Sequence, residues 1–323
     1  MKKNLLFIAA SAALALVSCQ RETSPAAVKP VEVNVIIQGS APTRATVVTY
    51  ASESRVENLQ VYVFHEGKLE DYRNAGEAML AQLTATSGIR TVWALVNAPV
   101  ISDILTEEEL RSRVSRLSEN RTDAFVRTGS TTQELTDGGT VPVTVKRIVS
   151  RVSIGKITTA YQYALASESL TIDGIYLINV AADNNYAVNG TPSAWVNQLR
   201  HKDNAYDALL YDAVNQRLGN GESYTKEHVF YPYPNPTEAA SYADTWTPRH
   251  TMLVVEVTFQ GKKGYYPIEL PVLERNKTYV IDELVVKHRP GEEPYKPLET
   301  GDATVQITVN DWETGLNLGT LTL

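Results

Sequence analysis

The only cysteine of the 323-residue chain, Cys19, stands at the end of an apolar run close to the N-terminus. Lys2 and Lys3 precede this run, which spans residues 5–17 and is too short for an ordinary membrane-spanning helix. A basic start followed by a short apolar stretch is typical of an export signal. A cysteine at this position can be acylated on its sulfur, so attachment of a lipid to Cys19 is the first chemistry that the sequence predicts.

The four residues that end with this thiol are Leu16, Val17, Ser18 and Cys19, and they resemble a bacterial lipobox. In a lipobox the cysteine is acylated and the signal is cut off directly in front of it. We therefore expect a signal peptide over residues 1–18 and a lipid on Cys19. The alternative is an ordinary signal peptide with a cysteine nearby by chance. With Cys19 acylated, the mature chain keeps no thiol for a disulfide or for catalysis.

The other residues that could do chemistry form no recognisable catalytic or metal-binding pattern. Walker, GxSxG and complete GxGxxG motifs are absent from the sequence. The run Asp183-Asn184-Asn185 could bind calcium in principle, but the rest of an EF-hand loop is missing. The histidines are dispersed, with no pair at metal-ligand spacing, at His65, His201, His228, His250 and His288. We therefore expect no catalytic residue, no metal, no cofactor and no enzymatic activity.

Two features near the ends of the chain could serve processing or assembly. Arg44 lies in a loop of small residues, and its long cation would suit a trypsin-like protease that cuts before Ala45; an ordinary loop arginine is the alternative. At the other end, an apolar tail follows Trp312. A free strand of this kind is an aggregation hazard, so it needs a partner, in its own domain or in another chain. The leucines of this tail are Leu316, Leu318, Leu321 and Leu323.

The elements that must position these features are mostly β-strands. Apolar and polar residues alternate over 31–38, which predicts a half-buried strand ahead of the arginine loop. The clearest helix is predicted over 106–117, where Thr106 and Glu109 form a capping box. Residues 181–225 read as long surface excursions. Further strands are expected over 59–64, 91–97, 141–157, 170–180, 252–259, 265–270 and 278–286.

Length and charge limit the possible functions. About 300 residues remain after export, which is enough for two domains of ordinary size, and a change of pattern near residue 155 suggests their boundary. The formal net charge of −7 argues against a nucleic-acid partner. No other apolar run is long enough to span a membrane.

One mechanism accounts for both terminal features. Cleavage after Arg44 would release the strand over 31–38 and leave an apolar groove in the N-terminal domain. The C-terminal strand of a neighbouring molecule could fill this groove by β-strand addition. Such a contact is heterologous and does not close on itself, so it would propagate into a filament.

Taken in order, these segments resemble the fimbrillin family, the lipoprotein pilins of type V fimbriae in Bacteroidales. Each segment is unspecific alone, but the resemblance runs almost from end to end. The matching segments are the lipobox 16–19, the loop 43–45, and the stretches 56–64, 91–97, 145–152, 230–235, 275–279 and 309–312.

The resemblance implies a mainly β fold with two transthyretin-like β-sandwich domains and a short helix in the N-terminal domain. It also implies that signal peptide 1–18 and propeptide 19–44 are removed. Domains over 45–155 and 156–323 would then remain, the second with a donor strand at about 313–323.

Carried over residue by residue, the resemblance makes Cys19 the acylation site and Arg44–Ala45 the scissile bond. Residues 31–38 become the discarded strand. The donor strand would present Leu316, Leu318, Leu321 and Leu323.

The expected function is that of a structural stalk subunit of a surface fimbria, supporting adhesion and biofilm formation. The precursor would reach the outer membrane through its lipid and become extracellular after cleavage. Expected partners are other fimbrial subunits, a trypsin-like processing protease, and a host or bacterial surface ligand. Two alternatives stay open: a fimbrial tip or anchor subunit, and a monomeric glycan-binding lipoprotein in which Trp195 or Trp246 stacks on sugar rings.

Overall fold

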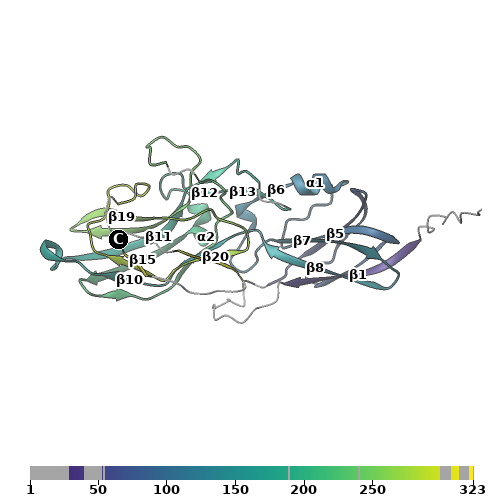
Figure 1. Cartoon of the computed structure of the whole chain (residues 1–323), viewed down its shortest axis with the longest axis horizontal. Helices are drawn as coiled ribbons and strands as arrows, with labels where there is room; N and C mark the ends of the chain where they lie inside the picture. Colours follow the sequence, from purple (N-terminus) through teal and green to yellow (C-terminus); the bar gives the residue numbers. More distant parts are fainter. Residues whose placement is uncertain are drawn as a thin grey trace, which may run out of the picture.

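The computed structural model describes residues 29–39, 53, 55–187, 190–238, 241–298, 307–312 and 320–322. Two β-rich halves follow one another along the long axis of the molecule, with the N-terminal strands in one half and the later strands in the other (Figure 1). Among the described helices, none has the length and apolar character that a membrane crossing requires.

The first half contains eight strands and one short helix. Its sheet has the strand order β3-β2-β5-β7-β8-β1-β4. The bounds of its elements are β1 (Pro30–Gly39), β2 (Leu59–His65), β3 (Lys68–Asn74), β4 (Leu80–Thr86), β5 (Gly88–Val96), α1 (Glu107–Ser112), β6 (Val114–Arg116), the 3-10 turn η2 (Leu117–Glu119), β7 (Arg127–Leu135) and β8 (Gly139–Arg147).

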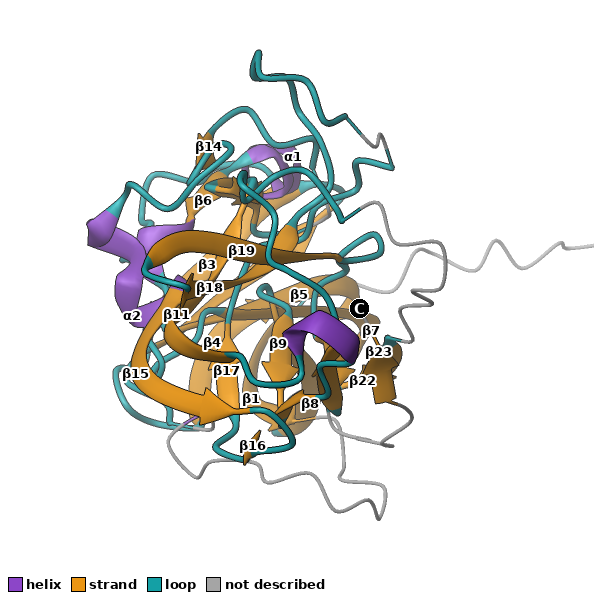
Figure 2. Ribbon diagram, turned by 90° about the vertical axis from the view of Figure 1, so that its left-hand side faces the viewer, coloured by secondary structure: helices purple, strands orange, loops and turns teal. Residues whose placement is uncertain are grey.

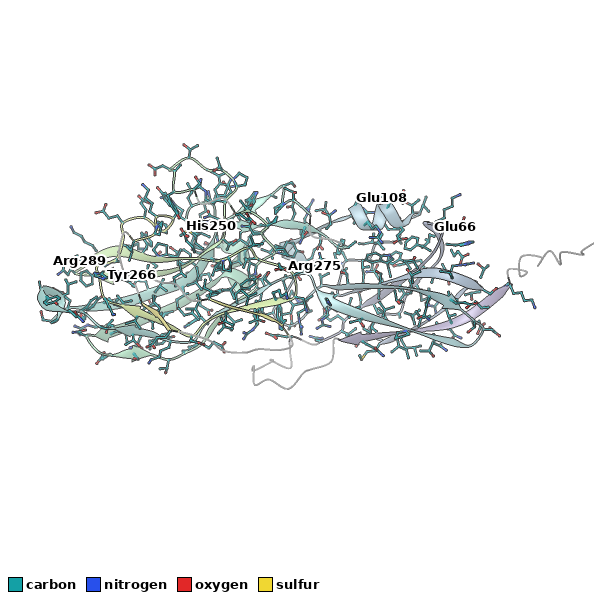
Figure 3. The ribbon with its side chains drawn as sticks, viewed as in Figure 1. Glu66, Glu108, His250, Tyr266, Arg275 and Arg289 are labelled. Carbon is teal, nitrogen blue, oxygen red and sulfur yellow. The ribbon has the colours of Figure 1, made fainter. Side chains whose placement is uncertain are left out.

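This seven-stranded sheet curls over on itself. Alternate side chains of β1, β2, β4, β5 and β8 enter one apolar cluster, which requires both ends of the sheet to face the same interior. A tight turn connects β2 and β3, with Glu66 and Gly67 at positive φ of 49° and 77°. Figure 3 labels Glu66 toward the outer end of this half.

The predicted helix is present but is shorter than expected. The capping box is confirmed, because Glu109 N donates to Thr106 Oγ1 and Thr106 N donates to the Glu109 carboxylate. The helix ends at Ser112 rather than continuing to residue 117, and Arg113 is extended. Val114 is 50% exposed because it lies in β6, which pairs with β13. This ladder with the second half replaces the last helical turns.

The described part of the second half contains the remaining strands and three short helical segments. The bounds of its elements are β9 (Arg151–Ile154), β10 (Ile157–Thr159), η3 (Tyr163–Leu165), β11 (Ser169–Ile178), β12 (Val180–Ala181), β13 (Asp183–Asn185), β14 (Trp195–Val196), η4 (Asn204–Tyr206), α2 (Asp207–Leu210), β15 (Tyr211–Gly219), β16 (Ser223–Tyr224), β17 (His228–Phe230), β18 (Met252–Phe259), β19 (Lys262–Glu269), β20 (Lys277–Ile281), β21 (Glu283–Val286), β22 (Thr308–Asp311) and β23 (Thr320–Thr322).

Three four-stranded sheets make up most of the described second half, with the orders β15-β11-β18-β19, β16-β10-β21-β23 and β17-β9-β20-β22, and β12 and β14 form a small further pair. The expected strand over 278–286 is in fact two strands, β20 and β21, which belong to different sheets. The expected surface excursion over 181–225 contains the nine-residue strand β15, which pairs with β11. Strand β15 was not predicted because most of its residues are polar and only part of one face is buried.

The mainly β, sandwich-like fold confirms the predicted fold class. Strand β9 pairs with β17 and β20, so the described sheets divide between β8 and β9. The expected domain boundary after residue 155 lies slightly beyond this division and stays a prediction. The largest apolar cluster contains side chains from both halves, including Trp93 and Leu95 from the first and Tyr231 and Trp312 from the second.

Candidate functional site: the slot of the first strand

Strand β1 is an inner strand of the first sheet. It runs antiparallel to β4, with Pro30 opposite Thr86 and Ile36 opposite Leu80. On its other side it runs parallel to β8, with Val33 opposite Gly139. The strand therefore lies between β8 and β4, which do not pair with each other in this sheet order. We call the space that β1 occupies between these two strands the slot.

The side chains that β1 turns inward fill the floor of this slot. Val31, Val33, Val35 and Ile37 are each no more than 5% exposed. Full burial of an aliphatic side chain contributes about 1.5–3 kcal/mol, so the four contribute about 6–12 kcal/mol to the uncleaved chain. They pack against a wall of apolar residues: Leu59, Val61, Val63, Ala81, Leu83, Ala85, Val92, Val141, Val143 and Val145.

The start of β1 is also held by hydrogen bonds outside the ladders. At its start, Ser87 N donates to Lys29 O at 2.8 Å and Lys29 N donates to Ser87 Oγ at 3.2 Å. Glu32 N donates to Asp137 Oδ1 at 3.1 Å. Removal of β1 would therefore strongly destabilise the folded domain, unless another strand takes its place.

Strand β4, the far wall of the slot, has β1 as its only backbone strand partner among the described residues. Its outer edge is held by carboxylates of β3 instead of by a backbone ladder. Thr84 N donates to Asp71 Oδ2 at 2.9 Å, and Thr86 N and Oγ1 donate to the Glu70 carboxylate at 3.3 and 2.5 Å. These bonds fix β4 independently of β1.

Glu70 is in turn paired with a buried cation. Arg90 Nε donates to Glu70 Oε2 at 2.9 Å, and the Arg90 side chain is 3% exposed. Burial raises the pKa of Glu70, but the hydrogen bonds from Thr86 and Arg90 outweigh it, and the pKa lies below the usual value. The carboxylate is therefore charged over the neutral range and keeps the wall of the slot in place.

Solved structures with a similar fold include cell adhesion and fimbrial proteins of Bacteroidales. A protein of Bacteroides eggerthii described as a candidate cell adhesion protein superposes with a TM-score of 0.65 at 15% identity, covering 88% of this chain and 96% of its own. A fimbrilin of Porphyromonas gingivalis gives 0.62 at 14% identity, covering 90% and 96%. A tip fimbrial protein of the same species gives 0.54 at 13% identity, covering 88% and 100%.

The chain has the fold of a fimbrilin. No family model matches the chain, and no curated relative was found by sequence. At this level of identity the likeness shows the fold alone. The resemblance read from the sequence is thus confirmed at the level of the fold.

The predicted site residues fall mostly outside the described part of this fimbrilin fold. Cys19, Arg44 and Ala45 lie outside the described residues, as do Leu316, Leu318 and Leu323. Leu321 belongs to β23, where it is opposite Leu284 of β21 in a parallel pair. The last described strand therefore pairs within its own half, the arrangement left open as the alternative to a partner chain. Figure 2 looks along the molecule from the end of the second half, and β22 and β23 are labelled at one flank.

Two tryptophans named as glycan-binding candidates are brought into contact. The rings of Trp195 and Trp246 meet edge to face, with centroids 5.6 Å apart. The Arg249 guanidinium lies 5.3 Å from the Trp246 ring and donates to four carbonyls of the segment 241–247. Both rings are partly buried, and one explanation for the pair is support of this loop.

The candidate calcium ligands have protein partners instead. Asp183 accepts hydrogen bonds from Ser193 N and Ala194 N at 2.8 and 3.1 Å, and Asn184 Oδ1 accepts from Gly190 N at 2.9 Å. Within the described residues, His, Asp and Glu form no cluster of three that could hold a metal ion.

One buried cluster was missed by sequence reasoning. The Glu53 carboxylate lies between the two halves, 1% exposed, and accepts hydrogen bonds from Tyr231 and Trp312. Glu53 is an isolated acidic residue between two serines, so it belongs to no hydrophobic repeat and to no known sequence motif. Only its position in space gives it significance.

Proposed function

We propose that the chain is a fimbrial subunit of the fimbrillin family, with the stalk as its place in the fimbria and adhesion and biofilm formation as its roles. The shared fold with a fimbrilin and with a tip fimbrial protein supports a place in a fimbria. The precursor is exported, acylated at Cys19 and delivered to the outer membrane. A trypsin-like protease then cuts the Arg44–Ala45 bond and makes the subunit extracellular.

Cleavage at Arg44 removes β1 from the mature subunit. The last residue of β1, Gly39, precedes Arg44 by only five positions, so the cut separates the whole strand from the rest of the chain. Without β1, the floor of the slot loses four buried aliphatic side chains, and β4 and β8 lose a hydrogen-bonding neighbour. The empty slot is an acceptor for an extended apolar segment.

The C-terminal tail of a second subunit is the proposed occupant of this slot. Leu316, Leu318, Leu321 and Leu323 supply apolar side chains in place of Val31, Val33, Val35 and Ile37. Because the tail of one molecule enters the slot of the next, the contact is heterologous and builds a filament. The partners of the subunit are then other fimbrial subunits.

The single observation that carries this proposal is that β1 is an inner strand, although it lies on the N-terminal side of the predicted cleavage loop. The decisive experiment is the N-terminal sequence of the mature surface protein. We expect it to begin at Ala45, and Arg44→Ala to accumulate uncleaved precursor that does not polymerise. A blocked, lipidated Cys19 on the mature protein, or normal polymers from Arg44→Ala, would reject the proposal.

A tip or anchor subunit is the alternative within the same fold, since one of the similar structures is a tip protein. Antibody labelling of fimbriae separates the two, because a stalk subunit lies all along the filament and a tip subunit lies at one end. A monomeric glycan-binding protein is the other alternative, with Trp195 and Trp246, which lie in contact, as the candidate residues. Sugar binding on a glycan array that is lost in Trp246→Ala would support it.

A further inference from the structure

Two surface features lie at opposite ends of the long axis of the molecule. Figure 3 labels Glu66 toward the outer end of the first half and Arg289 toward the outer end of the second half. Phe64 is paired with Thr91, so the turn at Glu66 lies beside the start of β5. We call the surface around Glu66 the front pole and the surface around Arg289 the rear pole.

The front pole is hollowed. An open pocket of about 430 Å³ lies between the turn that joins β2 to β3 and the first residues of β5. Its lining residues are Phe64, His65, Glu66, Ile89, Arg90 and Thr91. Ile89 is 69% exposed, and Glu66 is exposed at the tip of its turn. The pocket therefore offers an incoming group both an apolar side chain and a carboxylate.

The walls of this pocket are held from inside the first half. The buried Arg90 donates from Nη1 to the Ile89 carbonyl oxygen at 2.8 Å and from Nε to the Glu70 carboxylate at 2.9 Å. His65 Nδ1 lies 3.4 Å from the same carboxylate. Because these contacts hold the walls in place, the pocket is already formed when a partner arrives, and binding costs little ordering of the chain.

The rear pole carries a projecting aromatic side chain. Tyr163 is 91% exposed, the highest value among the large hydrophobic side chains that the structure describes. Its backbone has a positive φ of 52°, a conformation that bulky residues rarely adopt. Such strain persists only where other contacts impose it, and it is concentrated at functional sites. Tyr163 is therefore the candidate contact residue of the rear pole.

The turn that carries Tyr163 is held on both sides by one side chain. Asn220 Nδ2 donates to the carbonyl oxygens of Tyr161 and Ala166 at 3.0 and 2.9 Å. In return, Tyr161 N donates to Asn220 Oδ1 at 2.7 Å. Leu165, two residues after Tyr163, packs against the largest apolar cluster. A well-anchored turn therefore presents the tyrosine ring to solvent.

A cation lies on the same pole. Ala160 N donates to Val286 O at 2.8 Å, at the ends of the paired strands β10 and β21. The segments that lead to Tyr163 and to Arg289 therefore leave these two strands side by side. Arg289 is exposed, and its Nη1 donates to Gln260 Oε1 at 2.8 Å. The rear pole thus offers an aromatic ring and a positive charge, which are the counterparts of the front pole.

We propose that the rear pole of one subunit docks on the front pole of a second copy of this chain. The Tyr163 ring enters the pocket beside Ile89, and Arg289 faces Glu66. Because the two surfaces differ and lie at opposite ends of the long axis, the contact is heterologous and repeats along a line. It uses residues outside the slot and the C-terminal tail, and its place in a fimbria rests on the proposed function.

The chemistry of the two poles favours this partner and this orientation. Tyrosine and arginine are enriched among the residues that carry most of the binding energy of protein interfaces. The Tyr163 hydroxyl can form a hydrogen bond with His65 or Thr91 of the pocket. The opposite charges of Arg289 and Glu66 favour rear-to-front docking, whereas two front poles or two rear poles would bring like charges together.

The contact is small, so it acts together with another connection between the same two subunits. One aromatic side chain and one exposed ion pair do not hold two free molecules together for long. When strand exchange already joins the subunits, the effective concentration of the two poles is high and docking becomes favourable. The poles then fix the angle between consecutive subunits.

The first test is cross-linking of isolated fimbriae. Tyr163→Cys and Ile89→Cys are introduced into one chain, and the filaments are treated with a bis-maleimide that spans the length of the lost tyrosine ring. The control combines Tyr163→Cys with Val100→Cys, because Val100 is 61% exposed but lies beyond the opposite end of β5. We expect about tenfold or more cross-linked subunits from the first pair. Equal cross-linking of the two pairs would overturn the proposal.

The second test exchanges the charges of the two poles. Glu66→Arg and Arg289→Glu each place like charges together, and each should slow elongation about fivefold at low salt. The double variant restores opposite charges and should return to within about twofold of the wild-type rate. Arg116→Glu, at an exposed position of β6, is the control and should elongate normally. Single variants without effect, or a double variant as slow as the singles, would overturn the proposal.

Failure of this inference differs from failure of the proposed function. If wild-type fimbriae form but the pair at Tyr163 and Ile89 cross-links no better than its control, docking of the poles fails and strand exchange stands. If the wild-type chain forms no filament, strand exchange fails, and cross-linking of the same two variants as concentrated purified chains decides the docking. A preference for Ile89 over Val100 would then support it, and no preference would overturn it.

Discussion

The first and last described strands of this chain are held very differently. Strand β1 has ten residues, two neighbouring strands and four inward side chains that are almost fully buried. Strand β23 has three residues, lies at the edge of its sheet and, among the residues that the structure describes, pairs with β21 alone. A strand inside a sheet needs cleavage and replacement to leave it, whereas a short edge strand can leave by itself. The difference is what a subunit needs if it discards the first strand and donates the last.

The largest effect on stability is expected from a charge inside β1. Val35→Asp would place an unpaired carboxylate among apolar residues at a fully buried position, and it should lower the free energy of unfolding of the uncleaved chain by more than about 4 kcal/mol. Denaturant unfolding measures this change. The neighbouring Asn34→Asp, whose side chain points to the other face, is the matched control. Equal stability of the two variants would remove the contrast between β1 and β23.

A smaller effect is expected at the wall of the slot. Glu70→Gln leaves the buried Arg90 without its charged partner and weakens the bonds to Thr86, so unfolding should become easier by about 1–2 kcal/mol at neutral pH. Glu32→Gln, which changes a carboxylate bonded to the exposed Gln82 side chain, is the control and should have little effect.

The pH dependence sharpens this prediction. The folded-state pKa of Glu70 lies below its ordinary value of 4.5, so the ionised carboxylate favours the folded state. Its contribution is fully present above about pH 4.5 and is lost as the pH falls through the lowered pKa. Unfolding curves of wild type and Glu70→Gln should therefore converge in acid. A constant difference at all pH values would assign the effect to packing.

The smallest effect on stability is expected at the other end of the chain. Deletion of residues 315–323 removes β23, which contributes only one short ladder, and should cost about 1 kcal/mol. The same deletion should abolish elongation, giving folded monomers by size-exclusion chromatography and no filaments by electron microscopy. A loss of stability as large as that of Val35→Asp would show that the tail is part of the core, and continued filament growth would reject its role as donor.

Sequence reasoning was accurate wherever a signal is local. The alternation of Val31, Val33, Val35 and Ile37 predicted β1, and the strand expected over 252–259 is β18 with these bounds. The capping box of Thr106 and Glu109 is confirmed in full. Each of these signals lies within a few residues, so backbone geometry alone decides it.

The errors lie where distant contacts override local preference. The helix stops at Ser112 because residues 114–116 pair with β13, about seventy positions later in the chain. The expected strand over 278–286 divides into β20 and β21 because its first part pairs in one sheet and its last part pairs in another. Strand β15 was missed because its polar residues form a strand only through the ladder with β11.

By itself the sequence determined that a strand precedes Arg44 and which of its side chains face inward. The export signal in front of Cys19 stays a prediction. Only the tertiary structure decided that this strand is an inner one between β4 and β8, and that Glu53 meets Trp312 across 259 positions. The physical reason is the range of the forces. Side-chain periodicity depends on neighbouring residues, whereas strand pairing and buried hydrogen bonds depend on which distant segments the whole chain brings together.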